Sequence, residues 1–421
     1  MSDHAFQRVS VIGLGYIGLP TAAMLASRKL EVVGVDVNQR AVDTINCGEV
    51  HIVEPDLDII VRAAVSGGYL RATTKPEPAE AFLIAVPTPF KGHNHDPDLS
   101  YVEAAARNIA PVLKSGDLVI LESTSPVGAT EAMADWLAAA RPDLSFPQTK
   151  GEESDIRIAH CPERVLPGKV MQELIINDRV IGGMTAACAA RAVQLYETFV
   201  TGKCVVASSP RVAEMAKLTE NSFRDVNIAF ANELSLICHR FAIDVWELIS
   251  LANRHPRVNI LQPGPGVGGH CIAVDPWFIV SSAPDDAKLI RTAREVNDGK
   301  PGWVLDRIDE AIAAFLQRHP ERSVNDVRVA CYGLAFKPDI DDLRESPAMK
   351  ITKAMSQRHK GPLLVVEPHI EELPAGLCNA RLVTYDDAVE TADVHAILVA
   401  HSAFRSRSVA SDYVVDTIGA Q

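Results

Sequence analysis

The sequence predicts an α/β protein with two Rossmann-like parallel-sheet domains, joined by a long central helix and a helical middle domain. Short β-branched runs alternate with helical stretches through the first half of the chain and again near its end, a pattern typical of βαβ units around a parallel sheet. The length of 421 residues exceeds one ordinary core and favours two or three domains, at roughly 100 to 200 residues each.

The first sheet is predicted from seven short apolar runs. They cover residues 9–12, 32–35, 82–86, 118–121, 156–159, 180–181 and 204–206. Because helical stretches separate these runs, we expect the strands to be parallel. The N-terminal domain should therefore extend over residues 1–209.

The middle of the chain is mostly helical. A helix is predicted over about residues 211–253, and helical patterning resumes at 290–315, beyond a Gly/Pro-rich loop at 263–269. We expect this middle domain to cover residues 210–318. Strand-like runs then return, which predicts a smaller α/β domain over residues 319–421. These runs lie at residues 327–332, 363–366, 394–399 and 414–415.

Composition restricts the partners that we expect. The chain is 47% apolar with a net charge of −13 and has no basic stripe, so no nucleic-acid partner is indicated. No apolar run approaches the roughly 18 residues that span a bilayer, and strand-like sequence from Val9 leaves no room for a signal peptide, so we expect a cytoplasmic protein without membrane contact. The eight cysteines show no CxxC pair or Cys/His ligand spacing, which indicates neither a disulfide framework nor a metal site.

A glycine-rich motif, Gly13-Leu14-Gly15-Tyr16-Ile17-Gly18, lies between the first strand and a helix. The first two glycines permit a tight turn and close approach of a pyrophosphate to the backbone, and the third lets the helix pack on the strand. Asp36 ends the second strand, where a carboxylate accepts ribose hydroxyls and repels a 2′-phosphate. This favours NAD over NADP, although Arg40 nearby weakens that preference. We therefore expect NAD to bind the N-terminal domain.

Three threonines lie where a doubly wound sheet binds ligands, at the carboxyl ends of its strands. Thr88 and Thr124 follow two neighbouring predicted strands, and Thr130 lies at the start of the next helix. Thr88 and Thr130 are candidate cofactor contacts. A plain turn or capping role is the alternative for each threonine.

The predicted central helix carries a polar face. Glu214, Lys217, Asn221 and Arg224 are spaced three, four and three residues apart, so at about 100° per residue they share one side of the helix. A solvated exterior would explain this face. The apolar character of the other sides favours a face that lines a cleft, where a lysine could exchange protons.

Cys271 is the candidate nucleophile. A glycine-rich loop precedes it, and Asp275 follows four residues later. We expect the glycines to remove side chains from around the sulfur, and Asp275 to point toward it if a helical turn follows. A buried structural cysteine is the alternative. Beside a dinucleotide fold, an accessible cysteine favours thiohemiacetal chemistry, in which a thiolate adds to an aldehyde and the later thioester is hydrolysed.

These motifs recur in order in one known family. The chain resembles the UDP-glucose/GDP-mannose dehydrogenase family from end to end. The resemblance implies a four-electron oxidation at carbon 6 of a nucleotide sugar, consuming two NAD and one water, with the UDP-sugar bound by residues 319–421. The matching motifs are the Gly13 fingerprint, Glu122-Ser-Thr, Cys161-Pro-Glu-Arg164, Lys217-Leu-Thr-Glu-Asn221, Gly268-Gly-His-Cys271 and Gly333-Leu-Ala-Phe-Lys-Pro-Asp.

The resemblance also implies residue roles. Cys271 would be the nucleophile and Lys217 the proton donor and acceptor, whose ammonium also holds the developing oxyanion. Asn221 and Asp275 would place the hydrolytic water. The residues implied to assist are Thr124 and Glu163. The cofactor contacts are those of the glycine motif with Tyr16 and Ile17, together with Asp36, Arg40, Thr88, Thr130 and, by resemblance, Arg344.

Substrate contacts are carried over by position. The cationic ones suit a diphosphate, because arginine can bind two oxygens at once. The resemblance implies a homodimer in which Arg257 reaches the neighbouring subunit's site, although taken alone His255 and Arg257 would be ordinary surface residues. The implied contacts are Arg164, Val165, Lys217, Asn221, Arg224, His255, Arg257, Gly268, Phe336 and Lys337.

His270 and Val274 differ from the aromatic or serine and the lysine that UDP-glucose enzymes of the family typically carry. This points to an N-acetylhexosamine, and longer matching phrases such as residues 253–266 imply UDP-N-acetyl-D-mannosamine, whose uronate would feed surface polysaccharide such as enterobacterial common antigen. UDP-N-acetylglucosamine stays open as substrate. The alternatives from other classes are a two-electron hydroxyacid dehydrogenase and a non-catalytic NAD-binding scaffold.

Overall fold

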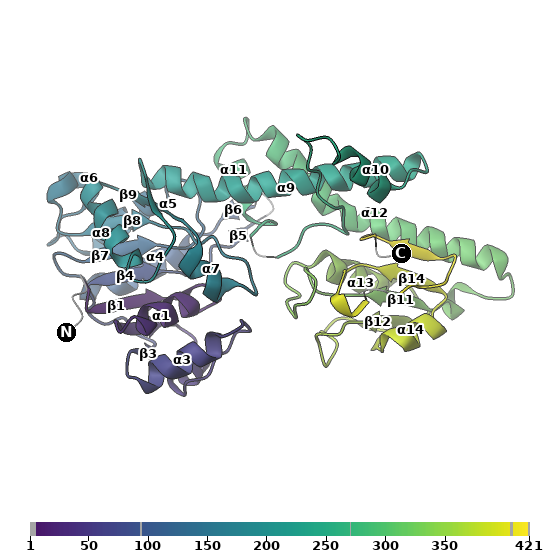
Figure 1. Ribbon diagram of the computed structural model, residues 1–421, viewed down its shortest axis with the longest axis horizontal. Helices are drawn as coiled ribbons and strands as arrows, with labels where there is room; N and C mark the ends of the chain where they lie inside the picture. The colour runs from purple at the N-terminus through teal and green to yellow at the C-terminus, as the bar shows by residue number, and fades with distance from the viewer. Residues whose placement is uncertain (1–5, 93–94, 270, 405–406, 420–421) are drawn as a thin grey trace. The chain divides into compact units, whose positions relative to one another are not determined.

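The structure is a computed structural model that describes residues 6–92, 95–269, 271–404 and 407–419 (Figure 1). It divides into two compact units, Met1–Glu220 and Asn221–Gln421, called unit 1 and unit 2 below. Helix α9 (Pro210–Arg240) begins in unit 1 and ends in unit 2. The three-domain division with boundaries at residues 209/210 and 318/319 stays a prediction.

Unit 1 is built on one large sheet. Its described strands have the order β10-β9-β8-β7-β4-β1-β2-β3, so the order reverses between β1 and β4, as in doubly wound folds. The strands are β1 (Arg8–Ile12), β2 (Glu31–Val35), β3 (Leu70–Thr73), β4 (Ala81–Ile84), β7 (Leu118–Leu121), β8 (Arg157–His160), β9 (Arg179–Gly183) and β10 (Cys204–Ala207), with a separate hairpin of β5 (Phe90–Lys91) and β6 (Asp96–Pro97).

Alternate residues of the unit 1 strands enter two different cores. Val9 and Val11 of β1 belong to one apolar cluster and Ile12 to the other. A strand that is buried on both faces reads as a continuous apolar run, which explains why the sequence predicted these strands well. The helices are α1 (Gly18–Ser27), α2 (Gln39–Asn46), α3 (Leu57–Ser66), α4 (Ser100–Ile109), α5 (Ala129–Ala140), α6 (Pro147–Lys150), α7 (Val170–Ile176) and α8 (Ala186–Tyr196), with 3-10 turns at Ala110–Val112 and Gly151–Glu153.

One pair of strands in unit 1 differs from the predicted all-parallel sheet. Strand β8 pairs with β9 in the antiparallel direction, through Ala159 with Gly183 and His160 with Gly182, whereas β9 and β10 are parallel to each other. An apolar run carries no information on strand direction, because the connection between strands sets it. The expectation of parallel strands was therefore wrong at this position.

Unit 2 contains a smaller parallel sheet with the order β13-β12-β11-β14-β15 in the described residues. Its strands are β11 (Val329–Tyr332), β12 (Leu363–Val366), β13 (Ala380–Leu382), β14 (Val394–Ile397) and β15 (Val414–Asp416). Its helices are α10 (Val245–Ala252), α11 (Asp275–Ser282), α12 (Lys288–Arg318), α13 (Pro347–Arg358) and α14 (Tyr385–Thr391), with 3-10 turns at Val324–Asp326 and Ser402–Phe404.

The single helix predicted over residues 211–253 is two helices, α9 and α10. The chain leaves α9 through Ala242, which adopts a left-handed φ of 52°. Asp244 then caps α10, because its side chain accepts hydrogen bonds from the backbone N–H groups of Trp246 and Glu247. An aspartate in this position is a typical N-cap, and the sequence signal for it was present.

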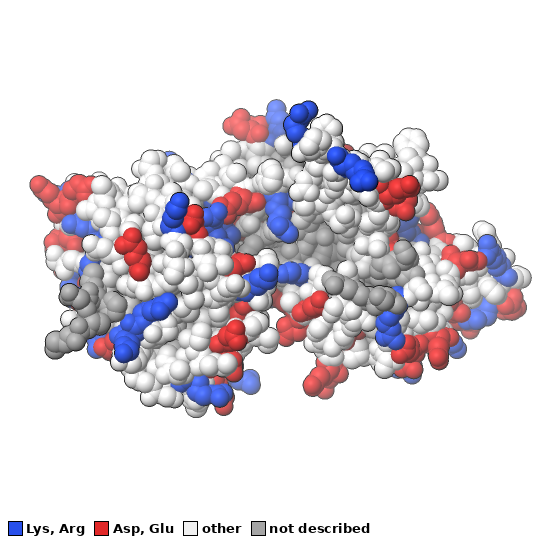
Figure 2. All heavy atoms as spheres, viewed as in Figure 1, with Lys and Arg blue, Asp and Glu red and all other residues white. Residues whose placement is uncertain are grey.

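Charges are mixed on the surface. On the face drawn in Figure 2, Lys and Arg side chains alternate with Asp and Glu, in keeping with the net charge of −13. No helix in the described part of the chain has the length and apolar character needed to span a bilayer.

Candidate active site

The glycine motif forms a tight turn between β1 and α1. Gly13 has a φ of 91° and donates its N–H to the Val35 carbonyl at 2.8 Å. A Cβ on Gly18 would lie 1.8 Å from the Gly13 carbonyl oxygen, whereas a Cβ on Gly15 would meet no atom within 4 Å. Gly13 and Gly18 are thus required by the turn itself, and Gly15 faces open space where a pyrophosphate could approach the backbone.

Asp36 lies beside this turn with both carboxylate oxygens partly satisfied. One oxygen accepts the Leu14 N–H and the other accepts the Asn38 N–H, each at 2.9 Å. A carboxylate offers about two lone pairs on each oxygen, so one on each remains for the hydroxyls of a ribose. Arg40 is exposed on the first turn of α2. These residues fit NAD.

Two of the predicted threonines hold the strand-end loops together. The Thr88 hydroxyl donates to the Thr124 carbonyl at 2.5 Å, and the Ser123 hydroxyl donates to the Val86 carbonyl at 2.6 Å. These bonds join the loops after β4 and β7, at the carboxyl edge of the sheet. Thr88 and Thr124 are both half-buried.

Thr130 has a different role from the expected cofactor contact. Its side chain has no exposed surface, and both its hydroxyl and its N–H donate to the Glu214 carboxylate, at 2.6 and 2.8 Å. The other Glu214 oxygen accepts the Gly128 N–H at 2.7 Å. A carboxylate from α9 therefore caps the start of α5, and the structure assigns Thr130 the capping role instead of an accessible cofactor contact.

Glu163 belongs to a buried cluster of ionisable groups. Its carboxylate accepts a hydrogen bond from the Arg179 guanidinium at 2.5 Å and another from the Arg164 backbone N–H at 2.6 Å. The Glu163 side chain is 7% exposed. Nearby, the Tyr196 hydroxyl donates to Glu122 at 2.7 Å. Desolvation raises the pKa of Glu122 to about 7, so this carboxyl group is poised to titrate near neutral pH.

Cys161 in the same cluster is not a nucleophile candidate. It is fully buried, and desolvation raises the pKa of its thiol to about 12, which suppresses the thiolate. Cys271, by contrast, is exposed. The buried structural cysteine that was the alternative for Cys271 is therefore excluded, and that description fits Cys161.

The α9 residues of unit 1 include Lys217, which is half-buried. Glu220, one turn further on, pairs with Arg164 at 2.7 Å, and Arg164 also donates to the Asp178 carbonyl at 3.2 Å. Val165 is half-buried. Arg164 is therefore held at the side of α9 by an acidic residue, a contact that a diphosphate would compete with.

In unit 2 the next turn of α9 connects to the region of the cysteine. The Asn221 amide donates to the buried Asp275 carboxylate. The Cys271 carbonyl accepts the N–H groups of Val274 and Asp275, at 3.1 and 2.8 Å. The helical turn that was expected after Cys271 is present, so Asn221, Cys271 and Asp275 lie close together. His270 lies outside the described residues.

The glycines before Cys271 serve close packing. A Cβ on Gly268 would lie 2.7 Å from the Glu345 carbonyl oxygen and 2.8 Å from Phe336, and a Cβ on Gly269 would lie 2.9 Å from the Phe336 ring. The expected reason for these glycines, access to the sulfur, is thus incomplete, because the loop needs them to pack against Phe336 and Pro347. Phe336 and Gly268, both predicted substrate contacts, are in mutual contact.

The remaining predicted contacts of unit 2 are mostly exposed. The Asn253 side chain closes the loop that carries His255 and Arg257, since it exchanges hydrogen bonds with the Ile260 N–H and carbonyl at 2.7 and 3.0 Å. His255 and Arg257 are exposed on this loop, as is Arg224 on α9, and Lys337 is half-buried. Arg344 is exposed and forms an ion pair with Asp342 at 2.5 Å.

The turn after β11, the first strand of the unit 2 sheet, repeats the backbone arrangement of the turn at Gly13. Gly333 has a φ of 92° and donates its N–H to the Val366 carbonyl at 2.7 Å. The Leu334 N–H donates to the Glu367 carboxylate at 2.7 Å, as Leu14 does to Asp36. Ala335 occupies the position of the second glycine.

Glu367 also belongs to a histidine cluster. It accepts a hydrogen bond from His401 Nε2 at 3.1 Å, and His401 Nδ1 accepts a hydrogen bond from the Asp339 N–H at 3.0 Å. Possible ligand atoms of Asp339, His369 and His401 lie within 4.8 Å of one another. Since both ring nitrogens of His401 already bond within the fold, this cluster is explained by the loops that it holds together.

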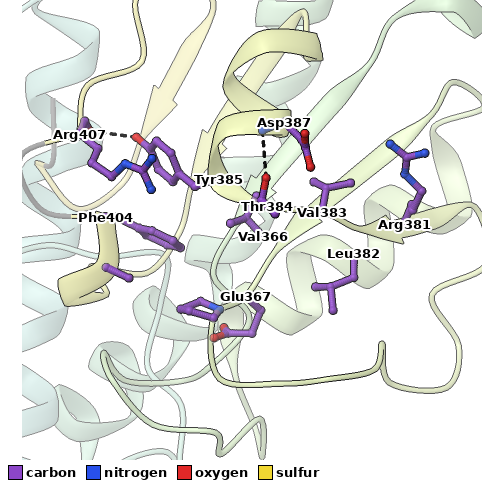
Figure 3. Close-up of a pocket in the computed structure, with 12 residues that line it drawn as sticks. Val366, Glu367, Arg381, Leu382, Val383, Thr384, Tyr385, Asp387, Phe404 and Arg407 are labelled. Carbon is purple, nitrogen blue, oxygen red and sulfur yellow. Dashed lines mark hydrogen bonds between the residues drawn. The ribbon is translucent and has the colours of Figure 1, made fainter.

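A pocket of about 580 Å³ lies beside Glu367, where β12 ends and β13 leads into α14 (Figure 3). The Arg407 guanidinium lies 4.3 Å from the centroid of the Tyr385 ring, whose hydroxyl donates to the Arg407 carbonyl at 2.9 Å. The described lining residues do not include Gly268, Phe336 or Lys337, so the predicted substrate contacts of unit 2 lie outside this pocket.

The turn at Gly13 with Asp36, together with an exposed cysteine on a close-packed glycine loop, defines a dinucleotide-binding dehydrogenase. Comparison with known families gives its relatives. The NAD binding domain of the UDP-glucose/GDP-mannose dehydrogenase family matches residues 7–200, the central domain matches residues 211–299, and the UDP binding domain matches residues 330–420. The chain belongs to this family, and NAD is its cofactor.

Individual relatives are similar over nearly the whole length. The chain is 65% identical to the UDP-N-acetyl-D-mannosamine dehydrogenase of Escherichia coli, with 99% of each chain covered. It is also 65% identical to an NDP-N-acetyl-D-galactosaminuronic acid dehydrogenase of Ralstonia nicotianae, covering 99% of this chain and 97% of the relative. Among solved structures, the UDP-D-ManNAc dehydrogenase of Pyrococcus horikoshii has a TM-score of 0.86 at 38% identity, covering 98% of this chain and 96% of that one.

Sequence reasoning missed several polar residues around the site. The Glu214 cap, the Glu163–Arg179 pair and the buried amides of Asn232 and Asn297 were not assigned these contacts. Glu214 and Asn221 share a helix face with Asn232, which lies eleven residues beyond Asn221, so extending the helical face would have found Asn232. Partners on other elements, such as Asn297, have no signal in a single sequence.

Proposed function

We propose that this chain oxidises UDP-N-acetyl-D-mannosamine at carbon 6 to UDP-N-acetyl-D-mannosaminuronate, consuming two NAD and one water. The observation that carries the proposal is the exposed Cys271, one helical turn from Asp275, whose carboxylate binds Asn221. The full-length similarity to the Escherichia coli UDP-N-acetyl-D-mannosamine dehydrogenase supports the substrate. Bound NAD accepts the hydride in each of the two oxidations.

Residues of this chain carry out the proton transfers, the nucleophilic attack and the orientation of water. In the proposal, Lys217 takes the proton of the substrate hydroxyl and holds the developing oxyanion. The Cys271 thiolate then adds to the aldehyde carbon to form a thiohemiacetal, which loses the second hydride and becomes a thioester. A water that Asn221 and Asp275 orient then attacks the thioester and releases the carboxylate product and the thiolate. In the proposal, Asp275 accepts the Asn221 amide through one carboxylate oxygen and takes a proton from this water through the other.

The second candidate sugar has specific support. A relative that acts on an N-acetylgalactosamine derivative, by its name, is as similar as the mannosamine enzyme, at 65% identity. Both sugars are 2-acetamido sugars, so the departure at Val274 from the lysine of UDP-glucose enzymes is compatible with either one. The configuration of the sugar is therefore part of the proposal that needs the most direct test.

We also propose that the protein is a homodimer. Phe223, Phe230 and Ile237 of α9 are 71%, 52% and 44% exposed and are spaced seven residues apart, so they form one apolar stripe. Exposed apolar stripes of this kind mark interaction surfaces. A second copy of α9 would cover the stripe by self-complementary packing around a two-fold axis. The contribution of Arg257 to the neighbouring site is included in this proposal.

The product would serve surface polysaccharide synthesis, such as that of enterobacterial common antigen. We propose that the reaction takes place in the cytoplasm, where NAD and nucleotide sugars are made. Two alternatives are less compatible with the sequence: a two-electron hydroxyacid dehydrogenase and a non-catalytic scaffold. Neither one needs the complete set of Lys217, Asn221, Cys271 and Asp275 that this chain carries.

The test is the stoichiometry of NADH to sugar with the three UDP-linked sugars of N-acetylmannosamine, N-acetylglucosamine and N-acetylgalactosamine. We expect two NADH per sugar, from the manno sugar. One NADH per sugar would contradict the thioester mechanism, and turnover of another epimer alone would contradict the substrate.

Replacement of the nucleophile tests the mechanism. Cys271→Ser should lower kcat by about a thousandfold or more, because a neutral hydroxyl cannot replace a thiolate, while NAD binding is retained. Cys378→Ser, at another exposed cysteine of unit 2, is the matched control and should keep its rate. A Cys271→Ser enzyme with the wild-type rate would remove covalent catalysis.

A further inference from the structure

A chain of buried amides connects α9, α12 and the loop that carries Cys271. The Gly264 N–H donates to the Asn232 side-chain oxygen at 2.9 Å. The Asn232 amide donates to the Asn297 oxygen at 2.8 Å, and the Asn297 amide donates to the Asp225 carboxylate at 2.8 Å. Arg294 donates to the same Asp225 oxygen at 2.7 Å. Except for Gly264, these residues are at most 1% exposed.

The two ends of the chain fix the direction of both amides. A backbone N–H such as that of Gly264 can only donate, and an ionised Asp225 can only accept. Both amides between them must therefore point their oxygens toward Gly264 and their NH₂ groups toward Asp225. Turning over one amide would place two donors or two acceptors opposite each other in a buried site, which costs about 1–3 kcal/mol for each unsatisfied group.

The same face of α9 holds the cysteine loop at both ends. Asn221 binds Asp275, which lies beyond Cys271 in the chain, and Asn232 binds Gly264, which lies at the start of the loop before Cys271. The two asparagines are eleven residues apart, which is close to three full turns of a helix. Between these anchors, Gly266 packs against the Asn297 carbonyl oxygen, at 3.2 Å from the position of a Cβ.

We propose that Asn232 and Asn297 are positioning residues for the nucleophile, which set the position of residues 264–269 through a hydrogen-bond chain of fixed direction. This inference rests on the proposed role of Cys271. Neither amide is proposed to touch the substrate. Their effect reaches the reaction through the loop, because a nucleophile displaced by about 1 Å can lose about a hundredfold in rate.

The charged groups around the chain determine how a variant will behave. Arg294 lies beside Asp225 and also pairs with Asp298. Lys300, one turn beyond Asn297 on α12, donates to Ser235, and burial lowers its pKa to about 7. Lys300 is present in every variant considered below, so comparison with the wild-type enzyme at each pH removes its contribution.

The test is Asn232→Asp. The new carboxyl group can still accept the Gly264 N–H, but its second oxygen faces the Asn297 oxygen. When this carboxyl group is ionised, its second oxygen repels the Asn297 oxygen. When it is protonated, it donates a hydrogen bond to the Asn297 oxygen and restores the hydrogen-bond chain. We therefore expect the kcat of the variant, relative to wild type, to fall about 10- to 100-fold at pH 8 and to recover as the pH falls toward about 5.5, with an unchanged Kd for NAD.

The matched control is Asn227→Asp. Asn227 is a half-buried residue of α9 whose amide donates to the Phe223 carbonyl of its own helix, so the same chemical change should leave the relative kcat independent of pH. Asn297→Asp provides a second test should Asn232→Asp fail to fold, because its carboxyl group would face Asp225 and should show the same recovery at low pH.

The outcomes are separable. A wild-type kcat at every pH, or a loss that does not depend on pH, would overturn the positioning role. Cys271→Ser is measured in parallel: if it keeps its rate the proposed mechanism fails, whereas an inactive Cys271→Ser beside an unaffected Asn232→Asp leaves the mechanism intact and refutes only the positioning role. Alkylation of Cys271 by iodoacetamide, relative to wild type, should follow the same pH dependence as kcat.

Discussion

Asp36 is the residue whose replacement tests the cofactor site most directly. In Asp36→Asn, a single side-chain oxygen replaces two. The amide group must then face either the Leu14 or the Asn38 N–H, both of which donate to Asp36 in the native turn. One ribose hydroxyl loses a charged acceptor, and such hydrogen bonds contribute about 1.5–3 kcal/mol.

The expected loss follows from this value. About 2 kcal/mol corresponds to an increase of about 30-fold in the Kd for NAD. The Kd for NADP should change less, because removal of the carboxylate also removes its repulsion of a 2′-phosphate, so the preference for NAD should narrow. The change leaves every proposed substrate contact unaltered.

Calorimetric titration with each dinucleotide measures both effects. Asp43→Asn on α2 is the matched control, since Asp43 is exposed and its carboxylate accepts a hydrogen bond from the Gln39 side chain of the same helix. A tenfold change in Kd corresponds to about 1.4 kcal/mol. If the Kd of Asp36→Asn for NAD stays within about threefold of wild type, the assignment of the ribose to Asp36 is refuted.

Two further predictions concern unit 1. Gly15→Ala should fold normally but bind NAD more weakly, because its Cβ enters open space at the pyrophosphate position, whereas Gly18→Ala should destabilise unit 1, because its Cβ would overlap the Gly13 carbonyl oxygen; thermal melting and NAD titration separate the two, and equal melting temperatures would contradict the reasoning. Glu122→Gln should gain stability relative to wild type as the pH rises from about 5 to about 7.5. Desolvation raises the folded-state pKa of Glu122 from 4.5 to about 7, so its stabilising contribution is complete below 4.5 and is lost as the pH rises through 7. A difference in melting temperature that does not change with pH would contradict this.

The sequence predicted the buried strands of the fold and missed some of the strands at the sheet edges. Strands β7 and β12 were predicted with their observed bounds, because both faces are buried and the apolar run is continuous. Strand β3 was missed, since Arg71 interrupts it on the exposed side of an edge strand. The antiparallel pairing of β8 and β9 was also beyond the pattern, because direction depends on the connection.

The candidate site residues were predicted from local patterns in the same way, and the Thr130 prediction failed because it depended on a distant residue. Gly13 and Cys271 can be recognised from the glycines beside them in the sequence, and Asp36 from its place at the end of the second predicted strand. Thr130 was assigned to the cofactor because the residue that occupies its hydroxyl, Glu214, lies 84 positions further along the chain. Contacts of this kind come from tertiary packing and leave no pattern within one segment.

The repeated turn in unit 2 shows which part of a nucleotide-binding motif is structural. Gly333, Leu334 and Glu367 reproduce the hydrogen bonds of Gly13 and Leu14 with their strand and carboxylate. The difference is at the second glycine. Gly15 borders open space, whereas Ala335 in its place is buried.

This difference separates two requirements that the motif combines. The first glycine and the carboxylate build the turn and are kept wherever β–turn packing needs them, even where the carboxylate is saturated by His401 and backbone N–H groups. The second glycine is needed only where a pyrophosphate approaches the backbone. The loss of that glycine at Ala335 means that a ligand of unit 2 would have to be held by side chains, and the cationic and aromatic residues predicted there, Lys337 and Phe336, are of the kind that does so.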